Sequence, residues 1–240
     1  GFTIRWVTVG DKYAVTFIPS PMPPSKDCDL MYPTPDRQER RADFIVHGIG
    51  LIFILAAGLA LLLQAAVGHG LAVVAAVATY VACVAFSHVM SMFYHLSPFH
   101  DRRLMLRRID HAAIYLTIAG TFTPIFVLAG TEFSLFLLTT VWALAIPAML
   151  YKIFGKNLDS RWSLASYLGL GWMGLIGVPE MMEQLPPLSL WAMLAGGAFY
   201  SLGTIFYVRK GRPFRYSIWH SFVMMGGASF FVAIWVALTV

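Results

Sequence analysis

Charged residues are scarce in this sequence. Asp, Glu, Lys and Arg together make up 12% of its 240 residues, and the mean hydropathy is +0.70. Soluble globular domains carry about 25% charged residues, so the composition excludes an ordinary soluble domain. It predicts an integral membrane protein with a single membrane domain.

Cysteine is scarce as well. The chain has only Cys28, in the amino-terminal tail, and Cys83, deep in a long apolar run. A disulfide requires two Cα atoms within about 7 Å of each other, so a bridge between these two positions is implausible. The sequence therefore excludes a small scaffold held together by disulfides.

Long stretches without Asp, Glu, Lys or Arg predict the membrane helices. The charge-free stretches are 44–100, 111–131, 133–151, 162–179, 184–208 and 216–240. A spanning helix needs about 20 apolar residues, so the first stretch accommodates two helices and breaks at Gly68-His69-Gly70. The prediction is an all-α bundle of seven transmembrane helices, roughly 44–67, 71–97, 111–131, 133–151, 162–179, 186–208 and 216–240.

Basic residues lie on one side of this seven-helix arrangement. All 17 Lys and Arg precede the first helix or fall in the loops after the second, fourth and sixth. The other three loops carry only Glu132, Glu180 and Glu183. Cytoplasmic loops are enriched in Lys and Arg, so we expect a cytoplasmic N-terminus and a C-terminus outside. The basic loops of this topology account for the net charge of +5, so a nucleic-acid partner is not needed to explain it.

Residues 1–36 differ from the rest of the chain. The segment "TIRWVTVGDKYAVTFIP" alternates around Gly10-Asp11, which predicts a small β-hairpin, and a Pro-rich linker follows it. We therefore divide the chain into a cytoplasmic hairpin and linker, 1–36, and a membrane domain, 37–240. The hairpin either packs on the cytoplasmic loops or docks a partner protein. Residue 1 is Gly rather than Met, so we expect the gene product to start upstream.

Three polar residues share one stripe of the predicted helix 71–97. His88, Ser91 and His95 are spaced i, i+3 and i+7, which places them on one helical face. Lipid cannot satisfy their hydrogen bonds, so we expect this stripe to face the inside of the bundle. Ionisable residues within a membrane indicate a functional site.

Polar residues from other predicted helices lie at a similar depth. The topology puts His47 in the first turns of the first helix, Asp110 at the start of the third, and His220 about 7 Å into the last. Together, His95, His220 and Asp110 offer two imidazoles and a carboxylate, a zinc-binding combination that water or another ligand would complete. The alternative is a hydrogen-bonded network that holds three helices together. The spacing leaves both open.

Four segments carry a family resemblance: "ADFIVHGIG", "SMFYHL", "RRIDHAAIYLTIAGTFTP" and "SIWHSFV". They resemble successive blocks of the bacterial hemolysin III proteins, which belong with the progestin and adipoQ receptors, including the adiponectin receptors. The resemblance extends from about residue 32 to about residue 235. It implies a multi-pass protein of the bacterial inner (plasma) membrane with zinc bound by three His, and related enzymes hydrolyse the amide bond of ceramides.

The family pattern maps onto particular residues of this chain. Ser91 and His95 match its Ser-x3-His element, and Asp110 matches the Asp that holds or activates the zinc-bound water. The final His-x3-His element is "YSIWH" here, with Tyr216 in place of one His and His220 at the other. A phenol has a pKa near 10 and is a poor zinc ligand at neutral pH. The resemblance therefore implies a degraded site.

The same resemblance suggests replacement zinc ligands and supporting polar residues. A further family His is Phe230 in this chain, so zinc binding would need Asp110 or the deeper His88 as a substitute ligand. We interpret His47 and Asp43, one turn apart, as ordering the start of the first helix. We interpret His111 as forming a hydrogen bond between helices.

Two functions remain open at the level of sequence. The first is a zinc-dependent hydrolase acting on C–N amide bonds of lipids: zinc on His95 and His220 would activate water, Asp110 would act as base, and Ser91 would stabilise the oxyanion. The second is a non-catalytic accessory subunit or lipid-binding component of a larger membrane complex. The partners expected are membrane lipids, with a protein bound through residues 1–36 or a second copy of the chain as further options.

Overall fold

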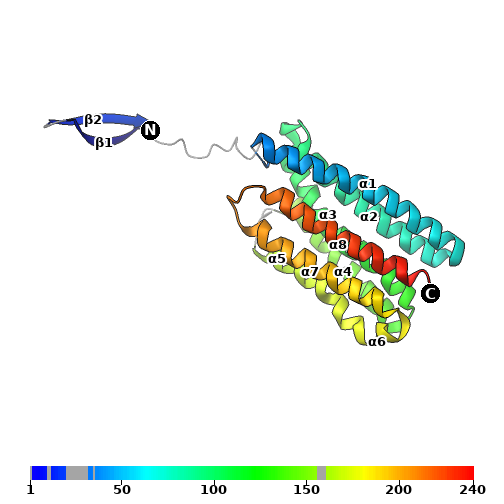
Figure 1. The fold of residues 1–240 in the computed structure, drawn as a ribbon. Helices are drawn as coiled ribbons and strands as arrows, with labels where there is room; N and C mark the ends of the chain where they lie inside the picture. Colours follow the sequence, from blue (N-terminus) through cyan, green and yellow to red (C-terminus); the bar gives the residue numbers. More distant parts are fainter. Residues whose placement is uncertain (1, 10–11, 20–31, 35, 156–160) are drawn as a thin grey trace.

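A computed structural model describes residues 2–9, 12–19, 32–34, 36–155 and 161–240 of the chain. Most of this part is a bundle of long helices that run side by side, parallel or antiparallel to one another (Figure 1). The helices are α1 (Arg37–Gly68), α2 (Leu71–Leu96), α3 (Arg103–Ala129), α4 (Glu132–Phe154), α5 (Arg161–Trp172), α6 (Val178–Gln184), α7 (Pro187–Val208) and α8 (Arg215–Ala237). Two 3-10 turns, η2 (His100–Arg102) and η3 (Met173–Gly177), precede α3 and α6.

Six helices in the described part of the chain are long and apolar enough to cross a membrane: α1, α2, α3 together with η2, α4, α7 and α8. The break between α1 and α2 falls at His69 and Gly70, as the sequence predicts. Each of these helices coincides with most of one predicted span, and where a helix falls short of the predicted span the difference is at most three residues. The chain is therefore a multi-pass helical membrane protein.

The predicted span 162–179 has a different structure. α5 ends at Trp172, η3 interrupts the helix, and α6 resumes it at Val178. Glycine lowers helix propensity by about 1 kcal/mol relative to Ala, and this stretch contains several. One of them, Gly174, packs so closely on α3 that a Cβ added to it would lie 2.5 Å from Cε1 of Phe122. The seventh span thus stays a prediction.

α3 lies at the centre of the bundle. The most apolar window of this helix is 67% buried, against 22% for α1, α2 and α4. α2 and α4 pack on either side of it, and α8 also contacts it. The outer helices consequently expose apolar side chains on their outward faces, as lipid-facing helices do.

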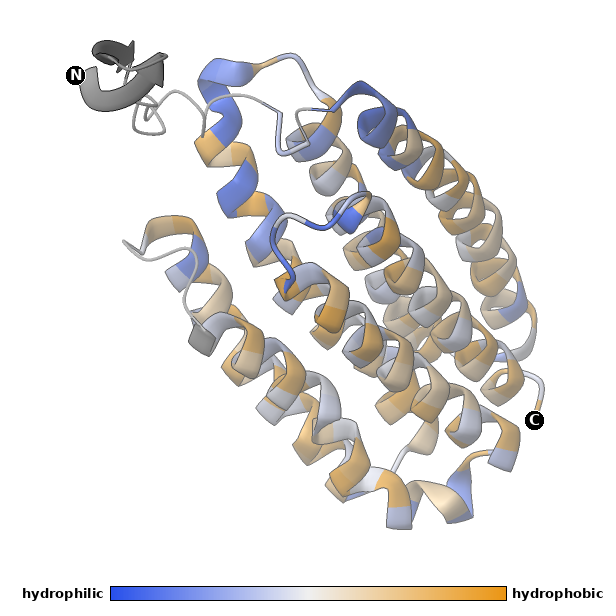
Figure 2. Cartoon of the chain, turned by 60° about the vertical axis from the view of Figure 1, so that its left-hand side comes forward, coloured by the Kyte–Doolittle hydropathy of each residue, from blue (hydrophilic) through white to orange (hydrophobic). Residues whose placement is uncertain are grey.

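Polar and apolar residues separate along the bundle axis. Figure 2 shows hydrophilic residues gathered at the end where α1 begins and where α2 connects to α3, with hydrophobic residues along the helices. The same end holds the connection between α7 and α8. Which side of the membrane this end occupies remains the prediction made from the basic residues.

The N-terminal segment contains two paired strands. β1 (Phe2–Val9) and β2 (Lys12–Pro19) are antiparallel, with Phe2 opposite Pro19 and Val9 opposite Lys12. The predicted turn at Gly10-Asp11 and residues 20–31 of the linker lie outside the described residues.

Candidate metal centre

The start of α1 fixes the position of the first two site residues. The Asp36 side chain caps the helix by accepting hydrogen bonds from the backbone N–H groups of Gln38 and Glu39, at 2.8 and 2.9 Å. Asp43 and His47 follow one turn apart, so they lie on the same face of α1. Both side chains point into the bundle and are only 1% exposed.

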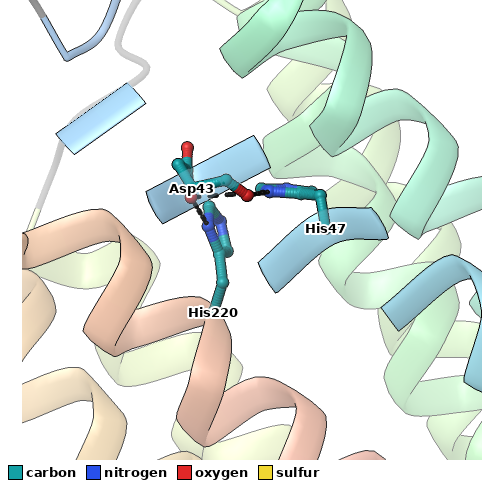
Figure 3. A group of neighbouring side chains, drawn as sticks. All are labelled: Asp43, His47 and His220. Carbon is teal, nitrogen blue, oxygen red and sulfur yellow. Dashed lines mark hydrogen bonds and ion pairs between the residues drawn. The ribbon is translucent and has the colours of Figure 1, made fainter. Parts of the chain in front are cut away.

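The Asp43 carboxylate is the hub of a buried polar cluster. Its Oδ1 lies 2.6 Å from Nδ1 of His220 on α8, and its Oδ2 lies 3.0 Å from Nδ1 of His95 on α2. His47 Nδ1 is 3.4 Å from the same Oδ1 (Figure 3). Side chains of α1, α2 and α8 thus meet at one carboxylate, whose charge must be compensated because it is buried in the bundle.

The four residues form a compact group. The rings of His95 and His220 have centroids 4.7 Å apart, and the rings of His47 and His220 are 4.2 Å apart. All four residues are buried, with at most 9% of the residue surface exposed. The expectation that His95 and His220 lie close together at one depth therefore agrees with their observed positions.

His47 is held mainly by its own helix and by α2. Its Nδ1 is 2.8 Å from the backbone oxygen of Asp43, and its Nε2 is 3.4 Å from Oγ of Ser91. His88, one of the candidate replacement ligands, uses its Nε2 to contact the His47 backbone oxygen at 2.8 Å. Ser91 and His88 therefore support the position of His47 and touch the cluster from one side.

The remaining candidates surround the cluster without joining it. Asp110 lines the same cavity as His95 and His220, but among the described residues no contact joins its carboxylate to either imidazole. The Tyr216 ring packs edge-on against His95, with centroids 4.7 Å apart. The backbone oxygen of His111 accepts a hydrogen bond from the Tyr167 hydroxyl at 2.9 Å, which links α3 to α5.

Asp43 is the residue whose place the sequence interpretation missed. The interpretation gave it a local role at the start of α1 and made Asp110 the carboxylate of the site. The structure puts Asp43 at the centre because α1 is turned so that this residue faces α8. Asp43 lies one turn before His47 on an otherwise apolar face of the helix, and this pattern was the sequence signal that its side chain faces the inside of the bundle.

The distances in the cluster test how it fits a zinc ion. Two ligands of tetrahedral zinc at bond lengths of 2.0–2.1 Å lie about 3.3 Å apart, whereas Asp43 Oδ1 and His220 Nδ1 are 2.6 Å apart. That separation is a hydrogen bond, in which the carboxylate accepts the Nδ1 proton. The Nε2 lone pair of His220 then remains available, and Asp43 takes the outer position of a carboxylate–histidine–metal arrangement.

His95 has a related but less complete contact. Its Nδ1 lies 3.0 Å from Asp43 Oδ2, within ion-pair distance, yet it lacks the alignment of a hydrogen bond and is a buried nitrogen without a hydrogen-bond partner. Both Nδ1 atoms face Asp43, which leaves Nε2 as the ring nitrogen of His95 and of His220 that points away from the carboxylate. The set Asp43, His47 and His220 also lies within the spacing of a metal site.

A largely apolar cavity of about 240 Å³ extends from the cluster into the bundle. His47 and Asp110 line it near the polar end, and Leu61, Ile118 and Phe122 line it farther along. Leu61 lies about 20 Å beyond His47 along α1, at 1.5 Å per residue. Many ligand sites combine a mostly apolar cavity with a few converging polar groups.

Comparison with known proteins identifies the family. A sequence model of the family described as Haemolysin-III related matches residues 38–231. A "Hemolysin-3 homolog" of Bacillus subtilis (strain 168) is 34% identical over 199 residues, which cover 82% of this chain and 93% of the relative. "Hemolysin-3" of Bacillus cereus is 33% identical over 199 residues, covering 82% and 90%.

A more distant relative belongs to the receptor branch of the resemblance. The human "Monocyte to macrophage differentiation factor" is 25% identical over 156 residues, which cover 61% of this chain and 63% of that protein. The matches agree with the blocks identified from the sequence. The chain belongs to the haemolysin-III related family of membrane proteins.

Proposed function

We propose that this protein is a zinc-dependent hydrolase that cleaves an amide bond of a membrane lipid. The supporting observation is the convergence of His95, His220 and Asp43 at the polar end of an apolar cavity. The imidazoles of His95 and His220 hold the ion through Nε2. Asp43 accepts the Nδ1 protons and keeps both rings in the tautomer that can bind a metal.

The other residues of the cavity take the roles that hydrolysis requires. A bound zinc ion supplies a Lewis acid and lowers the pKa of a coordinated water. Asp110 lines the same cavity as the histidines and acts as the base that receives a proton from water. Ser91, beside His47, donates a hydrogen bond to the oxyanion, and the apolar part of the cavity receives the acyl chain.

Metal analysis of the purified protein tests this function. We expect about one zinc per chain, loss of the metal in His220→Ala, and zinc affinity lower by about 10- to 100-fold in Asp43→Asn, the usual effect of removing an outer-sphere partner. His69→Ala is the matched control, since His69 lies in the α1–α2 connection and contacts the Leu238 backbone oxygen at 3.0 Å. A wild-type protein free of zinc, or equal loss in the control, would refute the proposal.

A second candidate function has an observation of its own. Tyr216 stands where the family pattern has a His, and the 2.6 Å contact between Asp43 and His220 is already a satisfied hydrogen bond without any ion. Both features suit a non-catalytic subunit that binds lipid and has lost the metal. For such a subunit, Tyr216→His creates zinc binding that the wild type lacks, and a partner protein, bound through residues 1–36, copurifies with the wild type.

The orientation of the bundle belongs to the same proposal. Seven spans, with the segment 161–184 as the fifth, put the N-terminus in the cytoplasm, the C-terminus outside and the cluster near the inner leaflet of a bacterial plasma membrane. A C-terminal alkaline phosphatase fusion should then be active and a C-terminal green fluorescent protein fusion dark. The reverse pattern would indicate six spans or the opposite orientation.

A further inference from the structure

A second and more open cavity, of about 450 Å³, lies at the start of α1. Its wall combines three guanidinium groups with apolar and aromatic side chains. The basic residues are Arg37, Arg40 and Arg41, and Phe44, Ile45 and Tyr32 lie beside them. Its residues are distinct from those of the metal centre.

Two of the arginines have no anionic partner among the residues that the structure describes. Arg37 and Arg41 are exposed, and among the described residues no carboxylate lies within 4.0 Å of either guanidinium. Arg40 is held differently: its Nη1 donates to the backbone oxygen of Thr34 at 3.2 Å, and its guanidinium stacks 4.7 Å from the centre of the Tyr32 ring. Of the described residues that form the cavity wall, none is acidic.

Tyr32 is fixed on its other sides by the α2–α3 connection. The Arg103 guanidinium lies 5.2 Å from the ring centre, and the His100 ring packs edge-on at 4.7 Å. Arg103 is only 2% exposed and donates to the backbone oxygens of Tyr94 and Ser97 at the end of α2. One wall of the cavity is therefore ordered before any ligand arrives, which reduces the entropy lost on binding.

Below the arginines, α1 presents an apolar face to the outside of the bundle. Phe44 and Ile45 are 61% and 57% exposed, and Ile49 and Ile52 continue the face at 63% and 71%. Positive charge followed along the same helix by exposed apolar side chains matches a ligand with an anionic head and an apolar tail. A soluble anion would use only the first of these features.

We propose that this cavity binds the headgroup phosphate of an anionic phospholipid. Arg37 and Arg41 contact the phosphate, which guanidinium groups recognise through paired hydrogen bonds. Arg40 and Tyr32 form the wall beside it, and an acyl chain lies along Phe44 and Ile49. Basic pockets beside membrane helices bind anionic headgroups in this way.

The alternative is that these arginines are only a diffuse positive surface of the kind that sets membrane topology. A specific site and a diffuse positive surface predict different results when basic residues outside the cavity are removed: only the diffuse surface would then bind lipid more weakly. Arg209 and Lys210, in the α7–α8 connection at the same end of the bundle, are exposed and lie outside the cavity. Arg209→Gln/Lys210→Gln therefore removes the same charge as Arg37→Gln/Arg41→Gln while leaving the cavity intact.

Equilibrium binding of radiolabelled phosphatidylglycerol to the purified full-length protein in detergent micelles tests the proposal. We expect saturable binding, weaker by about 30-fold in Arg37→Gln/Arg41→Gln, because each basic residue near an anionic lipid contributes about fivefold. The control double variant should stay within about twofold of the wild type. Arg37→Lys/Arg41→Lys keeps the charges but not the paired hydrogen bonds, so it should recover only part of the affinity, whereas a purely diffuse positive surface would recover all of it.

Two further measurements identify which part of the lipid the cavity recognises. Phosphatidylcholine has the same phosphate but also a choline cation that the arginines repel, so it should not displace the labelled lipid. Inorganic phosphate should compete only weakly because it has no acyl chain. Phe44→Gln should lower phosphatidylglycerol affinity and leave phosphate competition unchanged. Equal losses in both double variants, displacement by phosphatidylcholine, or full competition by inorganic phosphate would each overturn the proposal. None of these outcomes depends on the metal centre.

Discussion

Along α1, Asp43 and His47 near the start of the helix are each 1% exposed, and Leu61 and Ala65 near its end are each 0% exposed. Burial is the same, but the interactions differ. At the start, the side chains are held by directional contacts to α2 and α8. At the end they belong to an apolar cluster with residues such as Val77 and Phe126. Removing a polar partner should therefore destabilise the first region, whereas removing side-chain volume should destabilise the second.

The largest effect is expected in the apolar region. Phe126 is fully buried on α3 and stacks on Phe122, with ring centroids 5.3 Å apart. Phe126→Ala should lower the free energy of unfolding by about 4 kcal/mol, because the volume it leaves is not refilled. Denaturant titration in micelles measures this, with Phe133→Ala, an outward residue that is 39% exposed, as the control. If the stability lost in Phe126→Ala changed when zinc or a chelator was added, the apolar region would depend on the metal centre, which would contradict this comparison of the two regions.

The next effect should come from the hub of the polar region. Asp43→Ala takes the hydrogen-bond acceptor from Nδ1 of His220 and the ion-pair contact from Nδ1 of His95, and an orphaned buried group costs about 1–3 kcal/mol. We expect a total loss of about 3 kcal/mol in the same titration, with a chelator present. Asp110→Ala, which breaks no contact with these rings, should cost clearly less. Equal losses in the two variants would mean that Asp43 is not the structural hub.

A smaller effect should separate two glycines of the interrupted segment. A Cβ at Gly174 would meet the Phe122 ring, whereas one at Gly171 would meet nothing within 4 Å. Gly174→Ala should therefore cost about 2 kcal/mol through overpacking. Gly171→Ala should be neutral or slightly stabilising, since Ala favours helix. Thermal unfolding of the pair checks this, and a Gly174→Ala variant as stable as Gly171→Ala would show that η3 does not pack closely on α3.

The smallest effect should appear at the exposed N-cap of α1. Hydrogen bonds from backbone N–H groups, chiefly that of Glu39, lower the pKa of Asp36. A lowered pKa means that the cap is fully effective above the ordinary pKa of Asp and is lost as the pH falls through the lowered one. Amide exchange at Gln38 and Glu39 should therefore be faster in Asp36→Ala at neutral pH, with protection in the wild type lost only in acid. Equal protection in both proteins at neutral pH would exclude the cap.

The sequence was a reliable guide to which segments form long helices. Charge-free runs mark α1 to α4, α7 and α8 because desolvating a charge in lipid is costly, so charges collect where helices end. The same argument could not describe the segment after Arg161, where glycine content and close packing on Phe122 decide the local structure. Counting apolar residues measures length but not whether a helix is continuous.

The sequence by itself determined the membrane class, the family and the depth at which His95 and His220 lie. Only the tertiary structure decided which carboxylate meets them. Depth follows from counting residues along a helix, but each residue also turns the helix by about 100°, and the absolute rotation is set by how whole helices pack. The packing of α1 against α2 and α8 turns Asp43 towards the imidazoles, and Asp110 on α3 is left at the wall of the cavity.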